Sequence, residues 1–285
     1  MLVEVAWEVC NQVGGIYTVI RSKVPSMVER WKKNYCVMGP YFSGQAPSEF
    51  EPLEDEDCPF YRSAMNLRNK GFDVHYGQWL VTGRPRVVLL NPFSAYFRLG
   101  EIKYILWEHH NISSPDGNDL FDQVCAFGEL ARLFIWELIQ NTKDKNKLLA
   151  HFHEWMAGTA IPGLRKDNAP VGTIFTTHAT MLGRYLAMND PRFYENLSFV
   201  DWAKEAKYFN IESTVLVERA AAHGSHVFST VSEVTAKECV ALLGRKPDLI
   251  VPNGLNIERF TALHEFQNLH LKYKEKIHQF VMGHF

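Results

Sequence analysis

Short apolar runs recur along this chain, and helical patterns separate most of them. The runs are typical of strands and span residues 2–6, 35–38, 73–76, 86–90, 148–152, 171–175, 227–231 and 249–251. Strands that alternate with helices indicate crossover βαβ units, in which helices cover both faces of a mostly parallel sheet. The sequence therefore predicts an α/β fold.

Two helices can be delimited from the sequence. Residues 119–141 carry apolar side chains at helical spacing, which predicts a buried crossover helix. Ser232 is a suitable N-cap and Gly244 a suitable stop, so these two residues bracket a second, shorter helix.

Two further segments set the limits of the predicted domain. Residues 43–60 contain three prolines among six acidic residues, which predicts a solvated acidic loop. From residue 259 to residue 285 the apolar positions advance by three or four, which predicts a long amphipathic helix. We therefore expect one domain over residues 1–257, followed by a helix over residues 258–285.

Composition narrows the class of protein. With 46% hydrophobic residues the chain can build a large core, and a formal net charge of -2 without a dense Lys/Arg block argues against a nucleic-acid or membrane partner. Five scattered cysteines without a Cys-x-x-Cys pair favour reduced thiols in the cytoplasm. The start of the chain lacks a signal-peptide pattern, and no apolar run is long enough to span a bilayer.

The predicted strand at residues 171–175 leads into the first candidate site. His178 follows the apolar run and Arg184 follows six residues later. Ligands of open parallel sheets bind outside the carboxyl ends of the strands, so both side chains are candidates to contact an anionic or oxygen-rich molecule. The alternative is a hydrogen-bonded interior histidine beside a surface arginine.

A glycine pair follows the first predicted strand. After Gly14 and Gly15 the sequence continues as the first turns of a helix from Tyr17 onwards. Backbone N–H groups and partial positive charge at a helix N-terminus favour a phosphate group. A tight turn without a ligand is the alternative for such a pair.

His151 and His153 resemble a metal-binding pair because residues two apart on a strand share a face. No cysteine and no second histidine pair at metal-ligand spacing supplies the remaining ligands, although His109 and His110 are also present. We therefore expect neither a metal site nor another cofactor.

Several long segments together closely resemble glycogen synthases of the animal and fungal type. They are residues 8–19, 151–158, 173–186, 218–223, 252–256 and 264–270, and the match is loosest between about 43 and 122. The resemblance implies a Rossmann-like domain that forms one half of a glycosyltransferase B (GT-B) fold. The family transfers glucose with retention from UDP-glucose to the non-reducing end of glycogen, forming α-1,4 links. The second domain has no counterpart in this sequence, so the helix over 258–285 is expected to lead towards it, and the chain alone is expected to be inactive.

The resemblance also implies roles for individual residues. His178 corresponds to a catalytic residue near the sugar, and Arg184 corresponds to a residue near the diphosphate. Residues His153 and Glu154 correspond to the sugar or acceptor side, unless they only close a strand–helix turn. The implied contacts with UDP-glucose are Gln12, Gly14, Gly15, His178, Arg184 and Asn253. Gln12 departs from the family, which usually has lysine or arginine at that position.

Regulation and partners follow from the same resemblance. The implied glucose-6-phosphate site comprises His264, Glu265, Gln267, His270 and Lys274. The family completes this site with arginines of the second domain, so a solvated helix face is the alternative. Glycogen, glycogenin and glucose-6-phosphate are the expected partners, with a homo-oligomer in the full-length form. A non-catalytic module that docks glycogenin or glycogen is the alternative function, and a sucrose-synthase-like transferase is a third.

Overall fold

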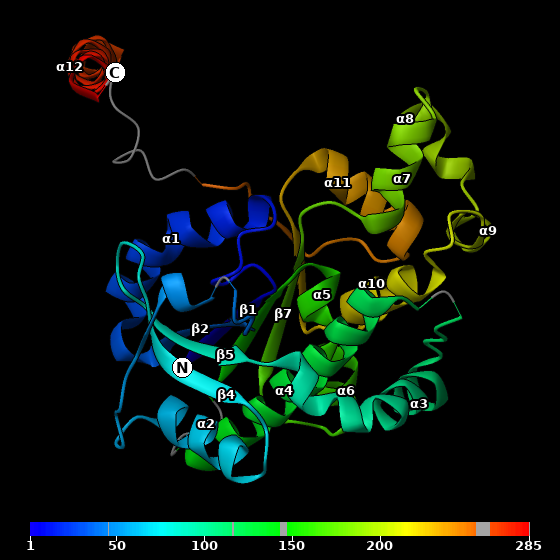
Figure 1. Cartoon of the computed structure of the whole chain (residues 1–285). Helices are drawn as coiled ribbons and strands as arrows, with labels where there is room; N and C mark the ends of the chain where they lie inside the picture. The colour runs from blue at the N-terminus through cyan, green and yellow to red at the C-terminus, as the bar shows by residue number, and fades with distance from the viewer. Residues whose placement is uncertain (45, 116, 143–146, 255–262, 285) are drawn as a thin grey trace. The chain divides into compact units, whose positions relative to one another are not determined.

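The computed structural model describes residues 1–44, 46–115, 117–142, 147–254 and 263–284. The chain divides into two compact units, Met1–Asn253 and Gly254–Phe285. In the first unit the described residues form one sheet of nine strands (Figure 1). The strands are β1 (Leu2–Ala6), β2 (Tyr35–Pro40), β3 (Phe50–Pro52), β4 (Val74–Trp79), β5 (Arg86–Leu90), β6 (Leu149–His153), β7 (Gly172–Thr177), β8 (Val227–Thr230) and β9 (Leu249–Ile250).

The sheet has the strand order β3-β4-β5-β2-β1-β6-β7-β8-β9. Strands β5, β2, β1, β6, β7, β8 and β9 pair in parallel, whereas β3 and β4 pair antiparallel at one edge. The described order confirms the predicted α/β class with a mostly parallel sheet. Because β1 lies in the middle, its carboxyl end is flanked by those of β2 and β6.

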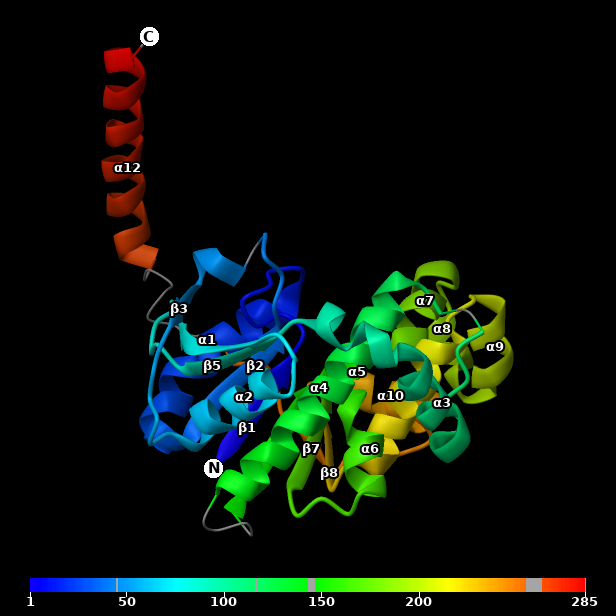
Figure 2. The same ribbon diagram turned by 60° about the horizontal axis from the view of Figure 1, so that its bottom comes forward.

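Helices cover both faces of this sheet. Figures 1 and 2 show α1 on one side and α2 with α4 on the other. The α-helices of the first unit are α1 (Gly15–Trp31), α2 (Pro59–Asn69), α3 (Leu99–His110), α4 (Asp119–Asn141), α5 (Glu154–Gly158), α6 (Ala160–Lys166), α7 (Met181–Asn189), α8 (Phe193–Asn196), α9 (Trp202–Tyr208), α10 (Glu212–Gly224) and α11 (Glu233–Glu238). Short 3-10 turns are η1 (Lys32–Asn34), η2 (Ala46–Ser48), η3 (Pro92–Arg98) and η5 (Leu197–Phe199).

Alternation along β1 divides its side chains between the two faces. Val3 and Val5 join the apolar cluster that includes α2 and α4, while Leu2 and Ala6 join the cluster that includes α1. Successive residues of a strand point to opposite faces. Glu4 therefore points towards α1, and it is fully buried there.

The two delimited helices form where the sequence predicts them. Helix α4 has the predicted bounds, and Asn118 caps it by accepting a hydrogen bond from Phe121 N. The Ser232 side chain caps α11, as predicted, by accepting a hydrogen bond from Thr235 N. The helix then continues as the π-helical turn η6 (Cys239–Leu243), and Gly244 ends it in the left-handed conformation with a φ of 73°.

The predicted acidic loop over residues 43–60 is partly wrong, because it contains the edge strand β3. Phe50 pairs with Trp79 of β4, and the Glu49 carboxylate accepts hydrogen bonds from the Trp79 indole and the Tyr17 hydroxyl. Pro52 is tolerated because an edge strand leaves one row of backbone donors unpaired. These tertiary partners outweigh the local proline and charge content.

The second unit contains helix α12 (Leu263–His284). The described side chains from 268 to 283 are exposed, apart from the half-buried Leu269. The start of the predicted helix, at residues 259–262, lies outside the described residues.

Two expectations about the chain's chemistry concern thiols and membranes. All five cysteines are buried and free. Among the described residues, no helix combines the length and the apolar character that crossing a membrane requires.

Candidate functional site

Polar side chains gather where β1, β6 and β7 run side by side. The parallel register sets Glu4 of β1 opposite His151 of β6, and His153 of β6 opposite Thr176 of β7. Since Glu4, His151 and His153 share the sheet face that α1 covers, their side chains meet beneath that helix. The cluster thus extends from the middle of β1 and β6 to the carboxyl end of β6, the edge at which open α/β sheets bind ligands.

Glu4 is the centre of this cluster. Its Oε2 accepts a hydrogen bond from the Tyr35 hydroxyl, and its Oε1 accepts one from His153 Nε2 at 2.7 Å. Lys23 of α1 forms an ion pair with Oε1. Burial raises the pKa of the Glu4 carboxyl, but Lys23 and His153 outweigh it and hold this pKa well below its usual range. Glu4 is therefore a buried, ionised carboxylate.

His178 directly follows β7, as predicted, and its ring contacts the cluster. His178 Nε2 lies 3.1 Å from His153 Nδ1. Burial, with Lys23 and Arg184 nearby, lowers the pKa of His178 to about 4. Burial, His151 and Lys23 likewise lower the pKa of His153 well below its usual value. Both imidazoles are consequently neutral at pH 7.

Glu154 joins His178 to Arg184. Its Oε1 accepts a hydrogen bond from the backbone N–H of His178 at 3.0 Å and lies 3.4 Å from Arg184 Nη2. Burial raises the pKa of Glu154 to about 7, although Arg184 opposes this shift. The Arg184 side chain is 53% exposed, so its guanidinium is held at one end and open to solvent at the rest.

Glu154 also has an unusual backbone conformation. It has a φ of 63° at the turn from β6 into α5. A residue other than glycine in the left-handed region stores strain, and such strain is concentrated at functional sites. This conformation directs the carboxylate back towards the His178 turn.

A second buried carboxylate supports the same turn. Glu218 of α10 accepts hydrogen bonds from the Thr177 hydroxyl at 2.8 Å and from Met181 N at 2.9 Å. Burial and the neighbouring Glu154 raise the pKa of Glu218 to about 8. Glu154 and Glu218 together therefore hold residues 177–181 from two sides.

The glycine loop differs from the sequence-based expectation. The Glu8 carboxylate accepts hydrogen bonds from Gly14 N at 2.8 Å and Tyr17 N at 2.9 Å. It thus occupies two of the donors that were expected to face a phosphate. Gly15 is exposed, and a Cβ atom added there would meet no atom within 4 Å. The Gly15 side of the loop is therefore open to a ligand.

The other predicted residues of the site differ in exposure. Gln12 and Asn253 are exposed, whereas His153 and Glu154 are only 2% and 5% exposed. His153 contacts Glu4 and His178, and Glu154 contacts His178 and Arg184. Both residues therefore hold other residues of the site in place. Sequence reasoning missed Glu4, Lys23 and Glu218, because their roles depend on pairings between distant segments.

His151, His153 and Glu4 form the group that most resembles a metal site. One ligand atom from each residue lies within 4.8 Å of the others. The predicted sharing of a face by the two histidines is confirmed, and Glu4 is the third ligand that the sequence did not reveal. However, the Lys23 ammonium group already binds the Glu4 oxygen that faces both histidines. A metal ion would have to displace this internal cation.

The predicted glucose-6-phosphate residues lie in the second unit. His270 and Lys274 are exposed and lie four residues apart, hence on one face of α12. The side chains of His264, Glu265 and Gln267 lie outside the described part of the chain.

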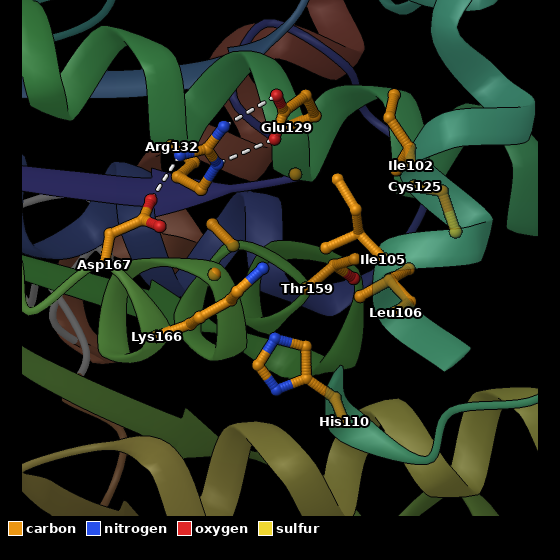
Figure 3. A pocket seen from close by; sticks show the side chains of 13 residues that line it. Ile102, Ile105, Leu106, His110, Cys125, Glu129, Arg132, Thr159, Lys166 and Asp167 are labelled. Atoms are coloured by element: carbon orange, nitrogen blue, oxygen red, sulfur yellow. Dashed lines mark hydrogen bonds and ion pairs between the residues drawn. The ribbon is translucent and has the colours of Figure 1, made fainter. Parts of the chain in front are cut away.

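A separate cavity lies between helices α3, α4 and α6, and Figure 3 shows its lining. Arg132 is held at its wall by Glu129 and Asp167. The ring of His110 faces the cavity below the end of Lys166 (Figure 3). None of the predicted site residues within the described ranges lines this cavity.

Comparison with known proteins assigns the family. The family described as glycogen synthase matches residues 4–285. The chain is 45% identical over 285 residues to a glycogen [starch] synthase of Neurospora crassa and 43% identical over 285 residues to the liver enzyme of Rattus norvegicus. It is also 45% identical over 294 residues to glycogen [starch] synthase isoform 1 of Saccharomyces cerevisiae.

These matches cover all of this chain but only 40% of the Neurospora and rat proteins and 41% of the yeast protein. The chain thus spans about two fifths of the length of the curated relatives it matches. Identity at this level over the whole chain, together with the family match, confirms the resemblance found in the sequence. This chain belongs to the glycogen synthase family.

Proposed function

We propose that this chain is the nucleotide-sugar side of a UDP-glucose-dependent glycosyltransferase that extends glycogen through α-1,4 links. The observation that carries the proposal is the shared carboxylate Glu154, which binds both the His178 backbone and the Arg184 guanidinium. This arrangement sets an imidazole and a cation side by side at the carboxyl end of β7. Membership of the glycogen synthase family supports it.

The chemistry of the two groups suits glucosyl transfer. Cleavage of the glucosyl bond leaves UDP as an anion, and a guanidinium fixed near it stabilises the developing negative charge. The exposed part of Arg184 is available for that contact. His178, the proposed catalytic residue, is neutral and orients the sugar by hydrogen bonding to a hydroxyl group.

Gln12 is the position at which donor binding differs from the family pattern. It is exposed next to the open Gly15 side of the loop. A neutral amide replaces a charge-assisted contact with a weaker one, which costs roughly 1.5 to 3 kcal/mol of UDP affinity. We expect Gln12→Lys to tighten UDP binding, as measured by titration calorimetry.

Further parts of the proposal concern the domain plan, regulation and partners. We propose that residues 1–257 form one Rossmann-like domain and that residues 258–285 lead towards a second domain of a GT-B fold. On that helix, the residues proposed to bind glucose-6-phosphate are His264, Glu265, Gln267, His270 and Lys274. We further propose that glycogenin is a partner, that the full-length form is a homo-oligomer, and that the protein is cytoplasmic.

A chimera tests the activity. The 285-residue chain is joined to the remaining portion of the Neurospora relative, and transfer of labelled glucose from UDP-glucose to glycogen is measured. We expect activity in the chimera and a loss of roughly 100- to 1000-fold with Arg184→Gln. Arg192→Gln, at an exposed arginine three residues after the end of α7, is the matched control. Unchanged turnover in the Arg184 variant would contradict the proposal.

An exposed aromatic pair favours glucan docking as a second function. Tyr104 and Trp107 of α3 are 57% and 54% exposed, and their ring centroids lie 5.9 Å apart. Aromatic rings combine an apolar face with a polar edge, which suits stacking on sugar rings. Calorimetry of the chain with a maltooligosaccharide tests this function. Binding that survives Trp107→Ala would exclude the pair as the docking site.

A further inference from the structure

Two hydrogen bonds link Glu4 through His153 to His178, and in each of them the donor and the acceptor can be assigned. An ionised carboxylate can only accept, so the 2.7 Å contact with Glu4 Oε1 requires a hydrogen on His153 Nε2. Lys23 Nζ lies farther from that nitrogen, at 3.4 Å, and donates to Glu4 instead. The proton of His153 is therefore on Nε2.

The tautomer of His153 then determines the donor in its hydrogen bond with His178. A neutral imidazole carries a single N–H, so His153 Nδ1 presents a lone pair. This Nδ1 lies 3.1 Å from His178 Nε2, which must be the donor. Because burial keeps the pKa of His178 near 4, its ring is neutral at pH 7 and its Nδ1 presents a lone pair as well.

Glu4, His153 and His178 thus form a hydrogen-bonded relay. Among its described ring nitrogens, His178 Nδ1 is the one that lacks a hydrogen-bond partner. The atom is buried, and the described residues offer it no hydrogen bond. A buried acceptor without a donor is unfavourable, because its interaction with water is lost on folding and not replaced. A hydroxyl group that reached it after a small side-chain movement would satisfy it.

We propose that Glu4 is a positioning residue that acts through His153 to fix the tautomer of His178, so that His178 Nδ1 accepts a hydrogen bond from a ligand hydroxyl group. The hydrogen bond made by one ring nitrogen of a histidine sets the state of the other. The identity of that hydroxyl as one of a glucosyl group depends on the proposed function. The tautomer itself does not depend on it.

Imidazole NMR tests the tautomer directly. The 285-residue chain is labelled with [15N]histidine, and long-range 1H–15N spectra are recorded at pH 7. Loss of signals in His178→Asn identifies those of His178. We expect a protonated Nε2 and an unprotonated Nδ1 for His178, and a protonated Nε2 for His153. A protonated Nδ1 on His178 would overturn the proposal without any other variant.

One variant of the Glu4 carboxylate and one of its partner Tyr35 test the relay. Glu4→Gln removes the charge, and we expect the ratio of the Nε2–H to the Nδ1–H form of His178 to fall roughly tenfold, the effect of one hydrogen bond to a charged group. Tyr35→Phe is the matched control, because it removes only the bond to the other Glu4 oxygen. An unchanged His178 tautomer in folded Glu4→Gln would remove Glu4 from the relay. If this variant does not fold, the wild-type spectrum still decides the tautomer.

A comparison of UDP-glucose with UDP separates the two proposals. We expect UDP-glucose, and not UDP, to shift the His178 Nδ1 resonance. If the predicted tautomer is present but neither compound binds, the proposed function fails and the relay stands. If both compounds bind and Nδ1 is protonated, the relay fails and the proposed function stands.

Discussion

The two faces of the central strands bury very different side chains. Towards α4, β1 and β6 present Val3, Val5, Ala150 and Phe152, which are all fully buried. Towards α1, the same strands present Glu4, His151 and His153 among apolar residues. Alternation along a strand therefore separates an apolar core from an ionisable one by a single residue step.

This difference indicates what each face contributes. An apolar face gains free energy in proportion to the area removed from water, independently of pH. A buried charge is tolerated only when it is paired and hydrogen bonded, and the fold gains little from it. The α1 face thus orders groups for binding, while the α4 face supplies much of the stability.

Replacement of Phe152 tests the apolar face. Phe152→Ala should lower the free energy of unfolding by about 3 to 5 kcal/mol, because it leaves a cavity in a fully buried position. The loss should be the same at pH 7 and pH 4.5, since no ionisable group of the variant differs. Urea unfolding at both pH values measures it, and a strongly pH-dependent loss would contradict the division of roles.

Replacement of Lys23 tests the ionisable face. Lys23→Met leaves Glu4 buried without its cation, although Tyr35 and His153 still donate to it. We expect a loss of about 3 kcal/mol at pH 7. The folded pKa of Glu4 is lowered, so this stabilisation is present above its usual pKa and is lost as the pH falls through the folded value.

The two variants should therefore diverge with pH. In folded Lys23→Met, burial without the cation raises the pKa of Glu4, so the carboxyl group takes up a proton as the pH falls from 7 to 4.5. The deficit of Lys23→Met should therefore shrink over this range, and that of Phe152→Ala should not. Lys237→Met, at an exposed lysine of α11, is the matched control and should change stability by less than about 0.5 kcal/mol. Equal deficits of Lys23→Met at both pH values would show that its charge is not what Glu4 requires.

Much of this organisation could be predicted from the sequence. The bounds of α4, the cap at Ser232 and the strand that ends just before His178 follow from local patterns of apolar and capping residues. The edge strand β3 could not be predicted, because its pairing with β4 depends on residues about thirty positions away.

The interior of the site could not be predicted for a similar reason. Glu4 is one charged residue in a short apolar run, and Lys23 resembles an ordinary surface residue of a helix. Only the packing of α1 on the sheet brings them together with His153. The glycine pair was recognisable, but the hydrogen bonds from the Gly14 and Tyr17 amides to Glu8 depend on the folded loop.

The contribution of Glu218 to the free energy of unfolding is expected to depend on pH less strongly than that of the Lys23–Glu4 pair, and in the opposite sense. Its pKa is raised to about 8 and that of Glu154 to about 7, so their contribution is complete below the usual carboxyl pKa and declines as the pH rises through these values. The histidines of the cluster have lowered pKa values, so their effect lies below about pH 6.5. Above that pH the two carboxyl groups dominate the cluster's contribution.

Between pH 6.5 and pH 8, Glu218 alone should lower the free energy of unfolding by roughly 1 to 2 kcal/mol. Glu218→Gln should remove this part of the decline, as measured by urea unfolding at the two pH values. Glu195→Gln, at an exposed glutamate of α8, serves as the control. If Glu218→Gln leaves the decline in the free energy of unfolding between the two pH values unaltered, other groups cause it.

The smallest effects are expected at the glycine pair, which lies at the rim of the ionisable face. A Cβ atom at Gly14 would approach Glu8 Oε1 to 3.0 Å, whereas one at Gly15 would meet nothing within 4 Å. Gly14→Ala should therefore cost roughly 1 kcal/mol by disturbing the Glu8 hydrogen bonds. Gly15→Ala should change stability by less than about 0.5 kcal/mol. Calorimetry with UDP should show the reverse order, with the larger loss of affinity in Gly15→Ala, because the Glu8 carboxylate already occupies the Gly14 amide. If Gly14→Ala weakens UDP binding more, the ligand displaces Glu8 and uses the amides that the carboxylate now occupies.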